Sequence, residues 1–313
     1  MDDDRGADQG ADSVAARVAA LVLTHNAPQS LERCVEALAA QTVPLSAIRV
    51  TDNASDPPVA LDVAAGHGIV VRRLDDNLGP AGGYAVALRE FLDTGLEWAW
   101  VMDDDCEPDR DALATQLADA APTRMVLPTV QWAETGETVR SLGWCGALIH
   151  RSVIERVGVP NPELFWWTED TEYLQWRIPE SGIEVVWTDR AVTRVSRGRD
   201  DAAKPAWKYY YEARNQVYHR LRVQRPATLP LPRPKPRHLR VTVRVWRASR
   251  AVAQLTGRVV AREHEQRGRK LASIAHGTVD GLRGRLGATV VPDTAHRPAF
   301  READVRDPER RSS

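Results

Sequence analysis

The sequence predicts an α/β fold, in which a mostly parallel sheet is flanked by helices and followed by a basic helical C-terminal extension. Apolar runs of strand length alternate with segments of helical periodicity, which is typical of a parallel sheet. The extension is predicted from charge. Residues 204–290 contain 20 Lys and Arg but 4 Asp and Glu, whereas the whole chain of 313 residues contains 42 and 43.

The expected strands and helices follow one another from residue 18. The run VAALVLT at Val18–Thr24 is continuously apolar, as expected of a strand that helices cover on both faces. Ser30 is expected to cap the next helix. We expect further strands at 47–51, 69–74, 98–102, 125–130, 147–149 and 183–187, and further helices at 81–92, 109–120 and 168–177, the last stopping at Pro179.

Composition divides the chain into five parts. They are a disordered lead at 1–13, the sheet domain at 14–222, a Pro-rich basic linker at 223–237, a basic helical extension at 238–290 and a disordered tail at 291–313. Within the extension, a stripe of apolar residues from Val241 to Val259 lies beside a row of arginines, which predicts a basic amphipathic helix over 240–262. Such a helix either docks on an anionic membrane or packs on the sheet domain.

The overall composition excludes several classes of protein. A net charge of −1 gives no sign of nucleic-acid binding. Cys34, Cys106 and Cys145 lie far apart without a CxxC spacing, which fits a reducing cytoplasm and argues against a zinc site. The acidic N-terminus does not resemble a signal peptide, and no run approaches the ~20 apolar residues of a spanning helix, so we expect any membrane contact to be peripheral.

Polar clusters follow four of the predicted strands. They are Thr24-His25-Asn26, Asp52-Asn53, Asp76-Asn77 and Asp103-Asp104-Asp105. Because ligands of open parallel sheets bind at the carboxyl ends of the strands, these clusters predict one polar rim. Each cluster by itself is also compatible with an ordinary turn or helix cap.

The three consecutive aspartates predict a divalent-cation site. In an extended segment alternate side chains share a face, so Asp103 and Asp105 are expected to converge while Asp104 points away. Two carboxylates together with substrate phosphates and water suit Mg²⁺ or Mn²⁺. The alternative is a solvated acidic turn that caps the helix expected near residue 109.

Two further motifs are candidates for substrate binding. The glycine-rich NLGPAGG at 77–83 matches neither GxGxxG nor a Walker loop. Its glycines either let the backbone come close to a phosphate or sugar near a helix N-terminus, or form a plain turn into a helix. In FWWTEDTEY, a carboxylate can act as a general base, or the acids can simply favour a helix N-terminus. Because the chain has ten Trp but three Phe, Trp166 and Trp167 are candidates for stacking on a sugar.

These motifs occur together in a known family. LTHN, TDNAS, DDNLGPAGGYAVAL, WAWVMDDDCEPD, ELFWWTEDTEYLQWR and YYYEARN appear in this order over residues 18–215. The chain thus resembles the family 2 inverting glycosyltransferases of the GT-A fold, in particular bacterial galactofuranosyltransferase-like and rhamnosyltransferase-like proteins. The motif YYYEARN has no independent interpretation from its residues beyond an amphipathic helix that packs on the sheet.

The resemblance implies a role for each motif residue. Asp103 and Asp105 would bind Mg²⁺ or Mn²⁺, Asp170 would be the general base, and Glu169 and Glu172 would be flanking acids that hold the acceptor beside Trp166 and Trp167. Residues that would contact the nucleotide-sugar donor are Thr24, Asn26, Asp52, Asn53, Asn77, Gly79, Gly82, Gly83 and Asp104. This assignment requires Asp170 to face Asp103 and Asp105 across one cleft.

The implied reaction is the transfer of galactofuranose or rhamnose from a UDP- or dTDP-sugar to a cell-envelope glycan or glycolipid. The expected location is cytoplasmic or peripheral on the inner face of the membrane. One departure from the family is that residues 188–200 contain no His, whereas relatives carry a metal-ligating His after the late strand; Arg194 or Ser196 lies near that place. This departure weakens the metal assignment and leaves open a non-catalytic nucleotide-sugar-binding relative.

Overall fold

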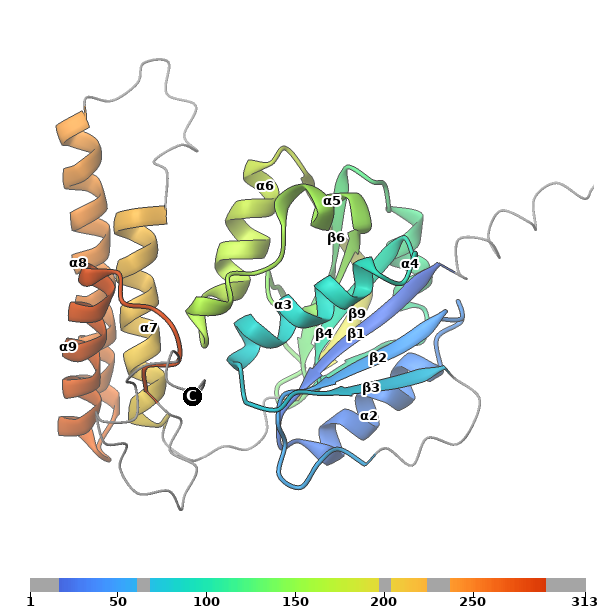
Figure 1. The fold of residues 1–313 in the computed structure, drawn as a ribbon, viewed down its shortest axis with the longest axis horizontal. Helices are drawn as coiled ribbons and strands as arrows, with labels where there is room; N and C mark the ends of the chain where they lie inside the picture. The colour runs from blue at the N-terminus through green and yellow to red at the C-terminus, as the bar shows by residue number, and fades with distance from the viewer. Residues whose placement is uncertain (1–16, 61–67, 197–203, 224–236, 291–313) are drawn as a thin grey trace, which may run out of the picture. The chain divides into compact units, whose positions relative to one another are not determined.

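The computed structural model describes residues 17–60, 68–196, 204–223 and 237–290 (Figure 1). The predicted lead and tail and most of the predicted linker lie outside these residues. The chain divides into two compact units, residues 1–202 and 203–313.

The first unit is built on a nine-stranded sheet in the order β3-β2-β1-β4-β8-β6-β9-β5, with β7 paired to β6. The strands are β1 (Val18–Thr24), β2 (Ala47–Asp52), β3 (Ile69–Arg73), β4 (Trp98–Asp103), β5 (Cys106–Pro108), β6 (Arg124–Trp132), β7 (Thr138–Arg140), β8 (Cys145–His150) and β9 (Glu184–Val195). Strands β3, β2, β1 and β4 are parallel, as expected. Strand β9 also runs parallel to β6, whereas β8 runs antiparallel to both β4 and β6, so most of the paired length is parallel and antiparallel strands are added to it.

Helices cover both faces of this sheet. They are α2 (Pro28–Ala39), α3 (Gly79–Leu92), α4 (Ala112–Ala118), α5 (Arg151–Val157) and α6 (Ile178–Glu180), with a 3₁₀ turn η1 (Pro162–Leu164) and a π-helix η2 (Thr171–Arg177). Alternate residues of β1 pack on opposite faces, Ala20 and Val22 in the cluster that contains α2 side chains and Ala19 and Leu21 in the cluster that contains α3 side chains. Burial on both faces explains why the first strand is apolar throughout.

Two helix ends differ from the prediction. Helix α2 begins at Pro28 with Ala27 at the cap position, so Ser30 lies inside the first turn and does not cap the helix. Proline is favoured at a first helical position, which outweighs the capping preference of serine. Pro179 does not stop the helix either. It lies in the first turn of α6, where its missing N–H breaks no hydrogen bond.

The second unit contains α7 (Ala206–Tyr218), η3 (His219–Val223), α8 (Arg237–Arg262) and α9 (Arg267–Arg283). The three α-helices lie side by side (Figure 1). Gly277 and Gly281 of α9 bring α7 very close, because a Cβ at either position would lie within 2.5 Å of an α7 carbonyl oxygen. The motif YYYEARN lies on α7, and within the second unit this helix packs on α8 and α9. In the part of the chain described here, no helix is long and apolar enough to cross a membrane.

Candidate functional site

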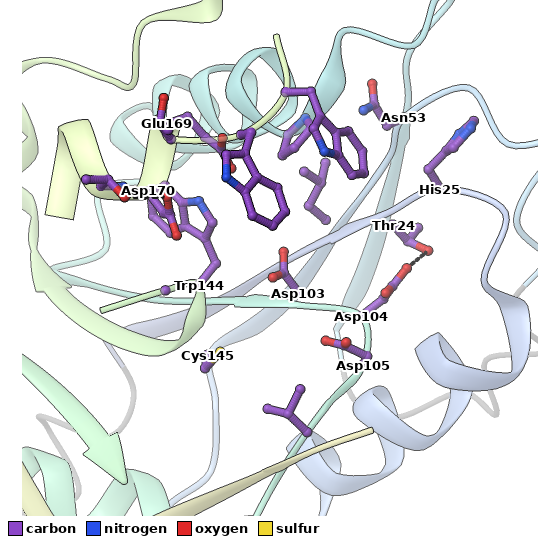
Figure 2. Close-up of a pocket in the computed structure, with 18 of the residues that line it drawn as sticks. Thr24, His25, Asn53, Asp103, Asp104, Asp105, Trp144, Cys145, Glu169 and Asp170 are labelled. Carbon is purple, nitrogen blue, oxygen red and sulfur yellow. Dashed lines mark hydrogen bonds between the residues drawn. The ribbon is translucent and has the colours of Figure 1, made fainter. Parts of the chain in front are cut away.

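A cavity of about 660 Å³ opens at the carboxyl ends of β1, β2 and β4. Its size is typical of a site for a small organic ligand. Figure 2 shows the carboxyl groups of Asp103, Asp104 and Asp105 grouped in one part of the cavity and those of Glu169 and Asp170 in another. The cavity therefore brings together the two acidic motifs, which are more than sixty residues apart in the sequence.

The acidic segment is a tight turn rather than an extended strand. Asp103 ends β4, and Asp104 and Asp105 form the turn that leads into β5. The expected alternation is therefore wrong: all three side chains line the cavity. Asp104 accepts a hydrogen bond of 2.5 Å from the Thr24 hydroxyl, and the Tyr84 hydroxyl donates to Asp103 Oδ1.

Burial raises the pKa of each of these aspartates, and the charge of Asp105 adds to the rise at Asp103 and at Asp104. Burial is the main cause of the strong rise in the pKa of Asp103, and the charge of Asp105 adds to it. Burial also raises the pKa of Asp104 to about 6 and raises the pKa of Asp105. A bound cation would relieve this repulsion, since an opposite charge within a few ångströms favours the ionised form.

The donor set fits a metal that takes only part of its ligands from protein. Carboxylate oxygens suit Mg²⁺ or Mn²⁺, and Mg²⁺ typically binds one or two carboxylates together with water and substrate phosphates. Among the residues that the structure describes, no three His, Cys, Asp or Glu side chains form a metal-binding group. The residues therefore fit a cation that the substrate helps to hold, and they do not fit a complete protein cage.

Arg194 and Ser196 are the two residues near the expected place of the missing histidine, and the backbone N–H of Ser196 donates to the Asp105 carbonyl oxygen at 3.2 Å. Arg194 instead forms an ion pair of 2.8 Å with Asp109 and is exposed, whereas its neighbour Val195 lines the cavity. An arginine near this place could bind a diphosphate directly, but Arg194 is not in the lining of the cavity, so its position does not support that role.

The second acidic motif supplies two carboxyl groups with different surroundings. Burial and the neighbouring Asp170 raise the pKa of Glu169 to about 8, and its Oε2 has no hydrogen-bond partner among the described residues. Asp170 also has a pKa raised by burial, but its Oδ1 accepts hydrogen bonds from the Thr171 backbone and hydroxyl. At neutral pH Glu169 is therefore mainly protonated, and Asp170 is the better candidate for a proton acceptor.

Glu172 does not join this pair. Its carboxylate forms a bidentate ion pair with Arg177, 2.8 Å at Oε1 and 2.5 Å at Oε2, and it is not among the residues that line the cavity. Glu169 and Glu172 are three residues apart, which on an α-helix would put them on one face. Residues 171–177 form a π-helix instead, and its different turn changes the direction in which Glu172 points.

Aromatic side chains form the rest of the cavity wall. Trp144 stacks on Tyr84 with ring centroids 4.2 Å apart and faces Tyr173 at 5.9 Å. Trp166 and Trp167 also line the cavity, and Trp167 is 42% exposed. The cavity therefore has flat apolar rings beside carboxyl groups. Such rings can stack on the apolar face of a sugar, and the carboxyl groups can bond to its hydroxyls.

The backbone that carries these tryptophans is strained. Phe165, Trp167 and Thr168 have φ values of 59°, 71° and 71°, a region that bulky side chains rarely adopt. The carbonyl oxygen of Phe165 accepts a hydrogen bond from the Ala81 N–H at the start of α3. Such strain clusters at binding and catalytic sites, where the surrounding fold maintains it.

The predicted nucleotide-binding residues separate into two groups. Thr24, Asn53 and Asn77 line the cavity, and the Asn53 amide donates to Asn77 Oδ1 at 3.1 Å. Asn26 and Asp52 do not line it. Asn26 accepts from the backbone of Asp56, and Asp52 accepts from backbone N–H groups and from Arg73, so both stabilise the turn after β2.

The three glycines that the resemblance assigns to donor binding, Gly79, Gly82 and Gly83, have a packing role in this structure. At Gly79, φ is +66° and a Cβ would lie 2.1 Å from the Phe165 carbonyl oxygen. At Gly83 a Cβ would lie 2.4 Å from the Leu23 side chain, and at Gly82 it would meet Leu78. These glycines are not in the described lining of the cavity, although Pro80 is. They allow α3 to approach β1 and the strained segment.

Sequence reasoning did not select several residues that belong to the site. His25, Trp132, Trp144 and Cys145 line the cavity, and Tyr84 holds Asp103. His25 lay within a motif that we quoted, and its Nε2 is 3.1 Å from the Asn77 amide. Trp144 has no local signal, because it reaches the site through the antiparallel pairing of β8 with β4.

Comparisons with known proteins identify the family of this chain and its fold. Residues 20–197 match the model of the family described as glycosyl transferase family 2. Galactofuranosyltransferase GlfT1 of Mycobacterium tuberculosis (strain ATCC 25618 / H37Rv) is 30% identical over a region that covers 53% of this chain and 66% of the relative. The chain thus spans slightly less than two thirds of the length of this curated relative.

Among solved structures, the mannosyltransferase PcManGT from Pyrobaculum calidifontis, in complex with GDP-Man and Mn²⁺, has a TM-score of 0.54 at 17% identity. The match covers 86% of this chain and 88% of that one. S. aureus TarS 1-349 in complex with UDP-GlcNAc has a TM-score of 0.51 at 13% identity, with 86% and 92% covered. At these identities the likeness shows the shared GT-A fold.

Proposed function

The chain belongs to glycosyl transferase family 2, and from this premise we propose that it transfers a galactofuranosyl residue, with inversion, from a nucleoside-diphosphate donor to a glycan or glycolipid hydroxyl. The choice of sugar is supported by the galactofuranosyltransferases of mycobacteria, which are 27–30% identical to it. A rhamnosyl donor is the competing choice that follows from the motifs. A cytoplasmic location stays a prediction.

The cavity walls support a division of labour between donor and acceptor. Thr24, Asn53 and Asn77 would bind the nucleoside of the donor, since all three line the cavity and the Asn53 amide donates to Asn77. Asp103 and Asp105 would hold a divalent cation, which when bound neutralises charge on the departing diphosphate. Trp166 and Trp167 would place the acceptor sugar near Asp170.

Asp170 is our candidate for the general base. The acceptor hydroxyl gives its proton to the Asp170 carboxylate while its oxygen forms a bond to the anomeric carbon. The bond from that carbon to the diphosphate breaks on the opposite side, so the configuration inverts. Glu169, protonated at neutral pH, can donate a hydrogen bond to the acceptor but does not compete for the proton.

One observation carries this proposal: the aspartates at the end of β4 and the Glu169–Asp170 pair line the same cavity. The experiment is a screen for nucleoside-diphosphate release with UDP-galactofuranose, dTDP-rhamnose and UDP-N-acetylglucosamine, with Mg²⁺ or Mn²⁺, and with glycan acceptors. We expect UDP-galactofuranose to be turned over. Asp170→Asn should lower kcat by about 10²-fold or more while donor affinity is unchanged.

Glu172→Gln is the matched control, because Glu172 lies outside the cavity lining and should leave kcat near that of the wild type. Asp105→Ala should weaken donor binding in the presence of the cation. If the protein binds nucleotides but turnover stays at background with every donor, the non-catalytic alternative is correct. If Asp105→Ala leaves nucleotide affinity unchanged, the proposal that Asp103 and Asp105 hold a cation is wrong.

A further inference from the structure

The second unit has an end at which three of its segments meet. The guanidinium of Arg244, near the start of α8, donates to the Leu221 carbonyl of η3 at 3.4 Å. The guanidinium of Arg222 in η3 donates to the Leu282 carbonyl at the end of α9 at 3.0 Å. The first turns of α8, the end of η3 and the end of α9 therefore lie close together.

Apolar side chains are exposed at this end. Val241, Val245 and Trp246 of α8 are 54%, 50% and 58% exposed, and Leu282 of α9 is 53% exposed. Val223, at the end of η3, is also exposed. Single exposed apolar residues need no explanation, but a group of large ones is typical of an interaction site.

The remainder of α8 behaves differently. Ala248, Ala251, Leu255 and Val259 are buried, and Leu255 and Val259 pack against Tyr209 of α7. The apolar stripe predicted from the sequence is thus divided. Its C-terminal part is the core of the second unit, whereas its first two members, Val241 and Val245, are not covered by the residues that the structure describes. Because the C-terminal part of α8 is packed within the second unit, the membrane alternative concerns only the first turns of this helix.

The charge around the exposed residues is positive. Helix α8 contains seven Arg and no Asp or Glu. Arg247 and Arg250 are exposed, and the Arg250 guanidinium lies over the Trp246 ring at 5.5 Å from its centroid. Exposed apolar side chains on a helix that contains Arg and no acidic residue match a bilayer whose apolar interior lies beneath anionic headgroups.

We propose that Val223, Val241, Val245, Trp246 and Leu282, with Arg247 and Arg250, form a docking surface for an anionic lipid bilayer. Valine and leucine side chains have no favourable partner in an RNA backbone, which argues against RNA as the occupant. A second copy of the chain would bring two sets of arginines together, which argues against a dimer. The proposal goes beyond the sugar transfer and does not depend on it.

The test measures binding of the full-length chain to lipid vesicles by flotation. Vesicles of phosphatidylcholine are compared with vesicles that also contain phosphatidylglycerol, at low and high salt. Binding should require the anionic lipid and weaken with salt. Arg247→Gln and Arg250→Gln should each reduce vesicle affinity about fivefold, the effect expected for one Arg near a charged surface. Val245→Ser combined with Trp246→Ser should reduce it further.

Matched controls come from the other end of the same helix. Val260 is 51% exposed and Arg262 is exposed, but both lie roughly 20 Å along α8 from Val245. Val260→Ser and Arg262→Gln should leave vesicle affinity unchanged. All these side chains are exposed, so the variants should fold like the wild type, and circular dichroism checks this.

Three outcomes would overturn the proposal. The first is no binding to anionic vesicles at low salt. The second is an equal loss of binding in the control variants and the docking-surface variants, which would mean that charge alone, without this surface, is responsible. The third is tighter binding to single-stranded RNA, or a dimer in light scattering, that the docking-surface variants abolish.

Discussion

Burial of Glu169 should make the stability of this protein depend on pH in a defined way. The carboxyl group has a reference pKa of 4.5, and burial followed by the charge of Asp170 raises it to about 8 in the folded chain. Because the folded pKa is the higher one, the stability associated with this group is fully present below pH 4.5 and is lost as the pH rises through about 8.

The size of the effect follows from the shift. A rise from 4.5 to about 8 is roughly 3.5 pKa units, and each unit corresponds to about 1.4 kcal/mol, so the loss is about 5 kcal/mol of unfolding free energy. Glu169→Gln removes the ionisable group while keeping its shape. The variant should therefore gain stability relative to the wild type as the pH rises, by up to about 5 kcal/mol.

Urea unfolding of both proteins, in parallel at pH values that span the two pKa values, measures this difference. The exposed Glu137→Gln serves as the control for the substitution itself. A difference between Glu169→Gln and the wild type that stays constant over that pH range would refute the argument that burial holds Glu169 protonated.

Two further predictions concern the groups that shape the site. Tyr84→Phe removes the hydroxyl that donates to Asp103, so Mn²⁺ affinity measured by calorimetry should fall roughly tenfold, whereas Tyr173→Phe, in the same aromatic stack, should leave it unchanged. Equal effects of both would contradict a role of the Asp103 hydrogen bond. Gly79→Ala should cost more than about 3 kcal/mol of unfolding free energy, because its Cβ would overlap a backbone oxygen. Gly95→Ala, which also has positive φ but open space around it, should cost about 1 kcal/mol, and similar losses would argue against the overlap.

Much of the fold could be predicted because local periodicity reflects local backbone geometry. Strand β1 was located to the residue, since a strand buried on both faces is apolar at every position. The polar clusters after β1, β2 and β4 predicted which end of the sheet carries the site, because parallel strands end at the same edge. Two of the predicted residues in these clusters, Asn26 and Asp52, lie at that edge but make turn contacts instead.

The sequence by itself therefore determined the α/β class, the acidic motifs and the edge at which they gather. Only the tertiary structure decided that Asp104 faces the cavity, that Glu172 is bound to Arg177, and that Trp144 stacks on Tyr84. It also decided that α8 is partly core and partly exposed. The physical reason is that a side chain's direction and partners depend on segments distant in the chain, through pairing and packing that no local pattern records.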